Sequence, residues 1–177
     1  QFLATLSGTY EVDVSLFGAS IINSPFTVIV SPSTLAVENS VITNHPSHSV
    51  AGSRAIVSVS ARDTFGNKLA ASDMVFGFSS SNAAVPLPGP ILVSQSYAGS
   101  GDYRVTFVAS VAGVYAMLLT LPVGVIEPSF QTVVSPTSAS QLFSRNLTTL
   151  TRSTVAGLSE TWRVHARDSY DNAHSDR

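Results

Sequence analysis

The sequence contains no cysteine among its 177 residues, and charged side chains are scarce. Without cysteine, the chain cannot form disulfide bonds, thiolate metal sites or thiol-based catalytic centres. Charged residues make up 11% of the chain, whereas roughly 25% is usual for a soluble domain. The net charge is −2, and the local cluster of basic residues is confined to Arg163, His165 and Arg167. This charge pattern argues against a nucleic-acid partner, which requires clustered lysine and arginine.

Long apolar runs and helical patterns are missing as well. No apolar run approaches the roughly 18 residues of a membrane-spanning helix, so no membrane span is predicted in this segment. No window of about a dozen residues has the apolar period of an amphipathic helix. The Gly-x-Ser-x-Gly motif of serine hydrolases is absent, and the acidic residues are spread among different elements. We therefore predict no enzymatic activity, no catalytic residue and no cofactor.

The sequence instead alternates apolar and polar residues in short runs separated by Gly, Pro and Asn. In residues 102–107, for example, every second side chain is Tyr, Val or Phe. This alternation is typical of strands with one buried face. The predicted strands cover residues 34–43, 53–63, 73–80, 91–97, 101–109, 112–121 and 128–135. About seven strands of this length predict an all-β fold, an immunoglobulin-like antiparallel β-sandwich.

The chain also repeats itself at an offset of about 105 residues, which is the size of a domain. Residues 59–67 (VSARDTFGN) match residues 164–172 (VHARDSYDN), and the segment 7–32 matches the segment 112–136. A repeat of this length is typical of sandwich domains in a tandem array.

The phase of the repeat predicts three pieces. Residues 1–31 are expected to supply the C-terminal strands of a preceding repeat. Residues 32–136 form one complete repeat, and residues 137–177 supply the N-terminal strands of a following repeat. The chain is therefore interpreted as a segment of a larger protein.

Four motifs occur in a fixed order: Gly101-Asp102-Tyr103-Arg104-Val105, Ala112-Gly113-Val114-Tyr115, Ser24-Pro25-Phe26-Thr27-Val28-Ile29-Val30, and the Asp-x-x-Gly-Asn turn within 59–67. Together they resemble the filamin-type immunoglobulin-like repeat, and the resemblance covers the whole chain. The second copy departs from the pattern at Pro128-Ser129, and Asp171 stands where the first copy has Gly66. The resemblance implies a divergent member of that family.

In filamin-type repeats, partner strands add alongside the third and fourth strands by β-augmentation. The resemblance places this edge at residues 74–80 and 91–97. A run of serines at 79–81 suits main-chain pairing, and no lysine or in-strand proline protects the edge. The candidate partner-binding residues are Met74, Phe76, Phe78, Ser80, Ile91, Val93 and Gln95.

The outer face of the predicted strand 112–121 carries a second candidate contact. The first copy has Glu11 and Asp13 on this face, whereas the second has Ala116 and Leu118. Loss of charge from an outer face is expected where the strand meets a neighbouring repeat. Random drift of the sequence explains the change equally well, so both interpretations stay open here.

Two matching loops, Asp63–Asn67 and Asp168–Asn172, concentrate side-chain oxygens. Calcium binding is one interpretation, because Ca²⁺ takes several oxygen ligands from flexible loops. We favour turn formation, in which Asp and Asn side chains bond to their own backbone. His45 and His48 are close in sequence but lack further ligands nearby, so no metal site is predicted.

Two functions fit these features. The first is a structural tandem-repeat segment, a spacer, adhesive or assembly module at the cell surface or outside the cell. Its partners would be other repeats of the same chain or assembly and further proteins. The low charge and the N-glycosylation sequon at Asn146 favour this interpretation. The alternative is a cytoplasmic, cytoskeletal filamin-like scaffold that binds partner peptides at the edge described above.

Overall fold

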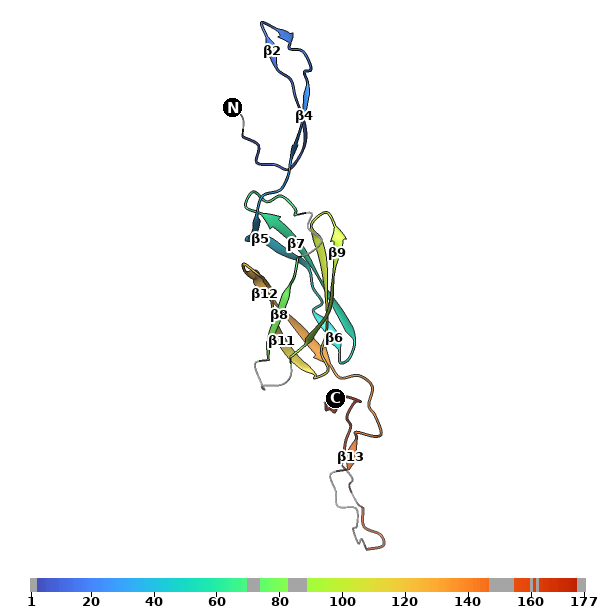
Figure 1. Ribbon diagram of the computed structural model, residues 1–177. Helices are drawn as coiled ribbons and strands as arrows, with labels where there is room; N and C mark the ends of the chain where they lie inside the picture. The colour runs from blue at the N-terminus through green and yellow to red at the C-terminus, as the bar shows by residue number, and fades with distance from the viewer. Residues whose placement is uncertain are drawn as a thin grey trace.

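The computed structural model describes residues 3–69, 74–82, 89–146, 155–159, 161 and 163–174. Within these residues the chain forms fourteen strands and no helix, and accordingly no helix there is long and apolar enough to cross a membrane. The parts of the chain follow one another along one line: an N-terminal hairpin, a central sandwich and a short C-terminal part (Figure 1). The all-β prediction is confirmed.

The central part is a sandwich of two four-stranded sheets. The order in the first sheet is β5 (Leu35–Asn44), β7 (Arg54–Asp63), β10 (Asp102–Val108) and β9 (Ile91–Gly99). The order in the second is β6 (His48–Val50), β12 (Gly124–Ser135), β11 (Gly113–Leu121) and β8 (Gly77–Asn82). All neighbours pair antiparallel except β6, which runs parallel to β12. This is an immunoglobulin-like arrangement.

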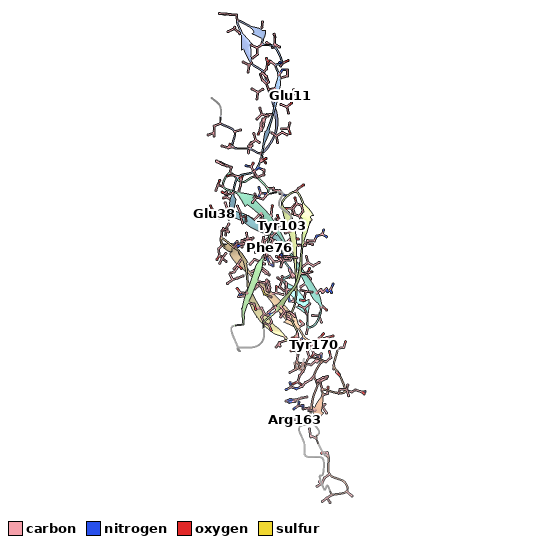
Figure 2. The ribbon with its side chains drawn as sticks, in the orientation of Figure 1. Glu11, Glu38, Phe76, Tyr103, Arg163 and Tyr170 are labelled. Atoms are coloured by element: carbon pink, nitrogen blue, oxygen red, sulfur yellow. The ribbon has the colours of Figure 1, made fainter. Side chains whose placement is uncertain are left out.

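The alternating residues of the facing strands fill the core. Tyr103, Phe107 and Leu119 are fully buried, and Phe76 packs against Tyr103 with ring centroids 5.2 Å apart (Figure 2). Phe78 stacks on Phe107 at the same centroid distance, 5.2 Å, whereas the Phe76 and Tyr103 rings are tilted against each other. Burial of one such large apolar side chain contributes about 1.5–3 kcal/mol to stability, so this interior holds the two sheets together.

The predicted strands correspond to β5 and β7–β12, with three differences. First, β8 begins at Gly77, because the Phe76 N–H bonds to a side chain and not to a strand; residue 73, where the predicted strand begins, lies outside the described residues. Second, β12 begins at Gly124, since β11 and β12 join through a short turn and continue across a shift in register. Third, β6 was not predicted; its three residues are too few to show alternation.

The N-terminal hairpin has the same pairing register as β11 and β12. Its strands are β1 (Gly8–Val12) and β4 (Phe26–Val30), with a small tip formed by β2 (Ser15–Leu16) and β3 (Ala19–Ser20). Tyr10 pairs with Val28 as Tyr115 pairs with Thr132. The C-terminal part contains the short pair β13 (Arg145–Asn146) and β14 (Val164–His165).

Candidate inter-repeat junction

Asp63 ends β7 and organises the loop that follows it. One carboxylate oxygen, Oδ1, accepts hydrogen bonds from the N–H groups of Phe65 (2.9 Å) and Asn67 (2.8 Å). The other, Oδ2, accepts from the Asn67 side-chain amide (2.9 Å) and from the N–H of Ser33 (2.7 Å) in the linker after β4. Gly66 supplies the positive φ of 84° that the turn needs. Asp63 therefore fixes both the loop and the linker.

The loop in turn holds the segment that precedes β1. The Asn67 amide nitrogen donates to the carbonyl of Thr5 (2.8 Å), and its oxygen accepts from the N–H of Ser7 (2.9 Å). Both contacts go to main-chain atoms of the N-terminal hairpin. A single asparagine side chain thus joins the central sandwich to the part before it.

The second copy of the loop has the same internal geometry. Asp168 accepts from the N–H groups of Tyr170 (2.8 Å), Asn172 (2.9 Å) and Thr137 (3.0 Å), and from the Asn172 side-chain amide (2.9 Å). Thr137 lies in the linker after β12, as Ser33 lies in the linker after β4. Asp168 is fully buried. The prediction that these loops use Asp and Asn for turn formation is confirmed.

Asn172 then makes the second junction. Its amide nitrogen donates to the carbonyl of Ser110 (2.8 Å), and its oxygen accepts from the N–H of Ala112 (2.7 Å). These are the main-chain groups that match those of Thr5 and Ser7 in the first junction. We call this contact, made by Asn67 at one junction and Asn172 at the other, the amide clamp.

A tyrosine holds the residue in the middle of each clamped turn. The Tyr115 hydroxyl donates to the carbonyl of Val111 (2.8 Å), and the Tyr10 hydroxyl donates to the carbonyl of Leu6 (2.8 Å). Such a tyrosine corner is typical of immunoglobulin-like sandwiches. The turn is therefore fixed by a tyrosine of the strand that follows it and clamped by an asparagine from the next part of the chain.

An aromatic ring adds a second contact at the junction with the C-terminal part. Tyr170 lies at the boundary between this part and the sandwich (Figure 2). Its ring packs on the backbone of Gly52, where an added Cβ would be 1.9 Å from the hydroxyl oxygen. Gly52 has a φ of 77° and lies in the turn between β6 and β7. Only glycine satisfies both conditions at this position.

The electrostatics of the loops follow from their hydrogen bonds. Burial raises the pKa of Asp63, but four hydrogen bonds outweigh burial and lower the pKa to about 2. The same opposition of burial and hydrogen bonds leaves the pKa of Asp168 below its ordinary value. Both carboxylate oxygens are already occupied by N–H donors. Among the described residues, no group of three or more His, Asp or Glu is placed to hold a metal ion.

Of the candidate partner-binding residues, Phe78 and Ser80 lie on β8 and Ile91, Val93 and Gln95 on β9, whereas Met74 and Phe76 lie in the segment just before β8. In the structure, β8 and β9 are the edge strands of the two sheets. Ile91 and Val93 are exposed on β9, whereas Phe76 is buried and Phe78 packs against the core. Ser80 pairs with Met117 of β11. Partner binding at this edge stays a prediction.

Two of the candidates, Met74 and Gln95, are engaged with each other. The Gln95 amide nitrogen donates to the carbonyl of Met74 (3.3 Å), while its oxygen accepts from the N–H of Phe76 (2.9 Å). Sequence reasoning placed these residues together at the edge but did not predict that Gln95 bonds to the backbone of its neighbour.

Ala116 and Leu118 lie half-buried on β11. The hydrogen bonds that join the sandwich to the C-terminal part go to the turn before β11, at Ser110 and Ala112. Contact of the outer face with a neighbouring repeat stays a prediction. The backbone of Asn146 pairs with Val164; its side chain lies outside the described part, and its glycosylation also stays a prediction.

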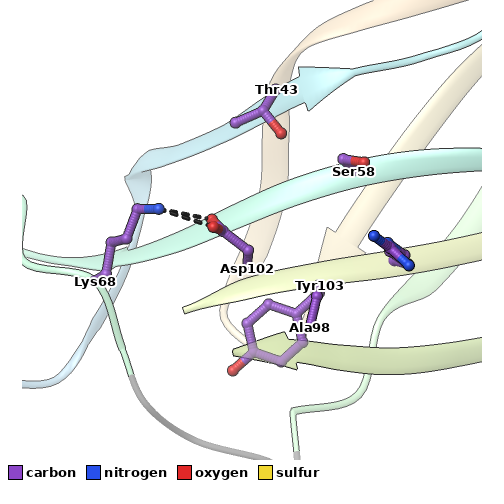
Figure 3. A pocket seen from close by; sticks show the side chains of 7 residues that line it. Thr43, Ser58, Lys68, Ala98, Asp102 and Tyr103 are labelled. Carbon is purple, nitrogen blue, oxygen red and sulfur yellow. Dashed lines mark hydrogen bonds and ion pairs between the residues drawn. The ribbon is translucent and has the colours of Figure 1, made fainter. Parts of the chain in front are cut away.

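One polar hollow of about 420 Å³ lies on the outer face of the first sheet (Figure 3). Lys68 and Asp102 form an ion pair across it with a distance of 2.9 Å. The hydrogen bond from Lys68 is the main cause of the lowered pKa of Asp102. The hollow is lined by Thr43, Ser58, Lys68, Ala98, Asp102, Tyr103 and Arg104. Lys68 and Asp102 thus neutralise each other within the hollow, and Arg104 is a further cation among its lining residues.

Sequence reasoning missed the amide clamp, although its signal was present. Asp and Asn are retained at both ends of the two matching loops, while the glycine between them is not: Gly66 is replaced by Asp171. Asp171 adopts the positive φ, 65°, that glycine supplies in the first loop. In both copies the Asn side chain bonds the preceding part of the chain as well as the Asp of its own turn.

Comparison with solved structures shows the same architecture. FdeC, an adhesin of Escherichia coli, matches 93% of this chain with a TM-score of 0.64 and 19% identity. InvD of Yersinia pseudotuberculosis matches 96% with a TM-score of 0.59 and 14% identity. Invasin, a bacterial integrin-binding protein, matches 88% with a TM-score of 0.58 and 14% identity. No protein-family model and no curated protein sequence matches the chain.

The match covers 52% of FdeC, 52% of InvD and 32% of invasin, so the chain spans about half or less of these structures. At such identities the likeness establishes the fold, an immunoglobulin-like sandwich with further segments in line. Two of the three proteins are named for adhesion or receptor binding, and none is named as an enzyme.

Proposed function

We propose that the chain is a structural segment of a tandem-repeat adhesive protein, in which it acts as a spacer with stiffened junctions. The observation that carries this proposal is the amide clamp, which occurs at both junctions with the same main-chain partners. A clamp that fixes one repeat on the next limits bending between them. Limited bending is what a protein needs in order to hold a binding element away from a surface.

The domain division belongs to this proposal: residues 1–31 as the end of one repeat, 32–136 as a complete repeat, and 137–177 as the start of another. The exposure of apolar residues in the N-terminal hairpin supports this division. Tyr10 is 37% exposed, while its counterpart Tyr115 is 0% exposed. Phe26 is 39% exposed and its counterpart Phe130 6%. The N-terminal hairpin carries the core face of a sandwich, and the other strands of that sandwich would cover this face in a longer chain.

The location and the family are inferred from the same features. The fold shared with adhesins, the low charge and the serine-rich and threonine-rich surface favour the cell surface or the extracellular space. The filamin-type motifs, including both tyrosine corners, fit a divergent branch of the sandwich family. Partners would be neighbouring repeats and other proteins, and the protein would not be an enzyme. The cytoskeletal alternative is less favoured, because Gln95 already bonds the backbone of Met74 and Phe76 where a partner strand would add.

Small-angle X-ray scattering of the full chain tests the spacer function. The wild type should scatter as an extended particle with a narrow range of lengths. The double variant Asn67→Ala/Asn172→Ala should give a broader and shorter distribution, while the exposed control Asn44→Ala should match the wild type. If the double variant kept the wild-type distribution, the clamp would not stiffen the junctions and the proposal would lose its basis. Labelling of intact cells from the native source with an antibody tests the surface location.

A further inference from the structure

A side chain of the first sheet bonds the segment that leads into β8, the edge strand of the second sheet. Gln95 lies on β9 and pairs through its backbone with Val105 of β10. Its side chain reaches across to the segment before β8 and bonds the carbonyl of Met74 and the N–H of Phe76. These groups flank Val75, one on either side. They are main-chain groups of the kind that an added strand uses in a sheet ladder.

The amide of Gln95 therefore occupies the place of a strand. The amide clamps at Thr5 and Ser7, and at Ser110 and Ala112, use the same pair of groups, the carbonyl of one residue and the N–H of the second residue after it. In those two cases the amide joins successive parts of the chain. At Met74 and Phe76 the amide comes from the same sandwich, so it closes an edge rather than joining two parts.

The surroundings show why an open edge here would be a hazard. Ile91 is 66% exposed, and Val75, Leu92 and Val93 are exposed as well. The segments 74–82 and 91–99 contain no charged residue, so two copies of this side would not repel each other. Apolar, uncharged edge strands are the sites at which sheets of separate molecules pair.

We propose that Gln95 protects the open side of the sandwich against strand addition, and that without Gln95 a second copy of this chain pairs there. The side-chain amide satisfies the backbone of residues 74–76 and keeps the exposed aliphatic residues of β9 from seeding a continuous sheet. Many such repeats packed side by side on a surface would need this protection in every sandwich.

The test uses the full chain with Gln95→Leu, which keeps the approximate size of the side chain and removes both hydrogen bonds. Amide hydrogen exchange of Phe76 should become roughly tenfold faster at low concentration, as expected for loss of one hydrogen bond. Sedimentation velocity should show dimers or larger species at high concentration. In those species the amides of Gly77–Ser79 should become protected.

Ser94→Leu is the matched control, because it adds the same apolar side chain at an exposed neighbouring position of β9 and leaves the Gln95 contacts in place. It should stay monomeric with a protected Phe76 amide. A monomeric Gln95→Leu variant with a fast-exchanging Phe76 amide would overturn the proposal. Gln95→Ala covers the case in which leucine does not fit; unfolding of both variants would assign Gln95 to stability rather than edge protection, and would also count against the proposal.

Discussion

Asn172 and Tyr115 hold the same turn from opposite sides of a junction. The Tyr115 hydroxyl bonds the carbonyl of Val111, and the Asn172 amide bonds the residues immediately before and after it, Ser110 and Ala112. The tyrosine thus holds the turn independently of the next part of the chain. A rigid turn loses little entropy when it is clamped, so the two hydrogen bonds of Asn172 act mainly on the position of the neighbouring part.

Replacement of Asn172 by alanine should loosen this junction. Asn172→Ala removes two hydrogen bonds across the junction and one to the buried Asp168, and we expect a loss of about 1–3 kcal/mol in local stability. The measurement is hydrogen exchange of the Ala112 amide, which should become faster. The exposed Asn44→Ala is the control. A protected Ala112 amide in Asn172→Ala would show that the turn does not depend on the clamp.

The effects of substitutions at Gly52 and Tyr170 on stability should depend on each other. Gly52→Ala introduces a Cβ where the Tyr170 ring lies and places alanine at a φ of 77°, so it should lower both stability and docking of the C-terminal part. Gly99→Ala shares the positive φ but meets nothing within 4 Å, so it reports the backbone strain alone. Thermal unfolding should show a larger loss for Gly52→Ala than for Gly99→Ala. The extra loss of thermal stability in Gly52→Ala should become smaller when Tyr170→Ala is also present. If Gly52→Ala and Gly99→Ala cost the same stability with and without Tyr170→Ala, the contact between Gly52 and Tyr170 would be excluded.

The low pKa of Asp63 predicts an acid-sensitive sandwich. Its pKa is about 2 in the folded chain and about 3.9 when unfolded, so the folded state binds the proton more weakly. The contribution to stability is therefore present above about pH 4 and is lost as the pH falls toward about 2. Chemical unfolding between pH 2 and pH 6 should show this decline, with a shallower slope in Asp63→Asn. The exposed, non-titrating control Asn44→Ala should follow the wild-type profile, and an unchanged slope in Asp63→Asn would contradict the assignment.

The strands could be predicted from the sequence because alternation of apolar and polar residues is a local property. Residues 102–107 show it, and they form β10 within one residue of the expected bounds. The edge position of β8 and β9 followed from the resemblance to filamin-type repeats and not from the alternation. What alternation does not report is where a polar side chain finds its partner. Gln95 bonds residues about 20 positions earlier, and no local pattern predicts that distance.

At the two junctions, the loops could be predicted from the sequence but the partners of their asparagines could not. The matching loops were visible in the sequence, and turn formation by Asp63 and Asp168 followed from the residue types. The partners of Asn67 and Asn172 are main-chain atoms of Thr5, Ser7, Ser110 and Ala112, whose side chains do not identify them. A contact that uses the backbone of its partner leaves no signature in the partner's residue types.

Because the amide clamp bonds only main-chain atoms of the turn, it should accept turns of different sequence as long as the N–H at position 7 is kept. Replacement of residues 5–7 by the residues of the second turn (Thr5→Ser, Leu6→Val, Ser7→Ala) should leave the junction intact, because Asn67 bonds only the carbonyl and the N–H. Ser7→Pro should break it, since proline has no N–H to donate. Exchange of the Asn67 side-chain amide protons, followed by nuclear magnetic resonance, should stay slow in the triple variant and become fast in Ser7→Pro. Fast exchange in the triple variant would mean that the side chains of the turn are recognised too, and repeats of this kind could then not be exchanged freely within an array.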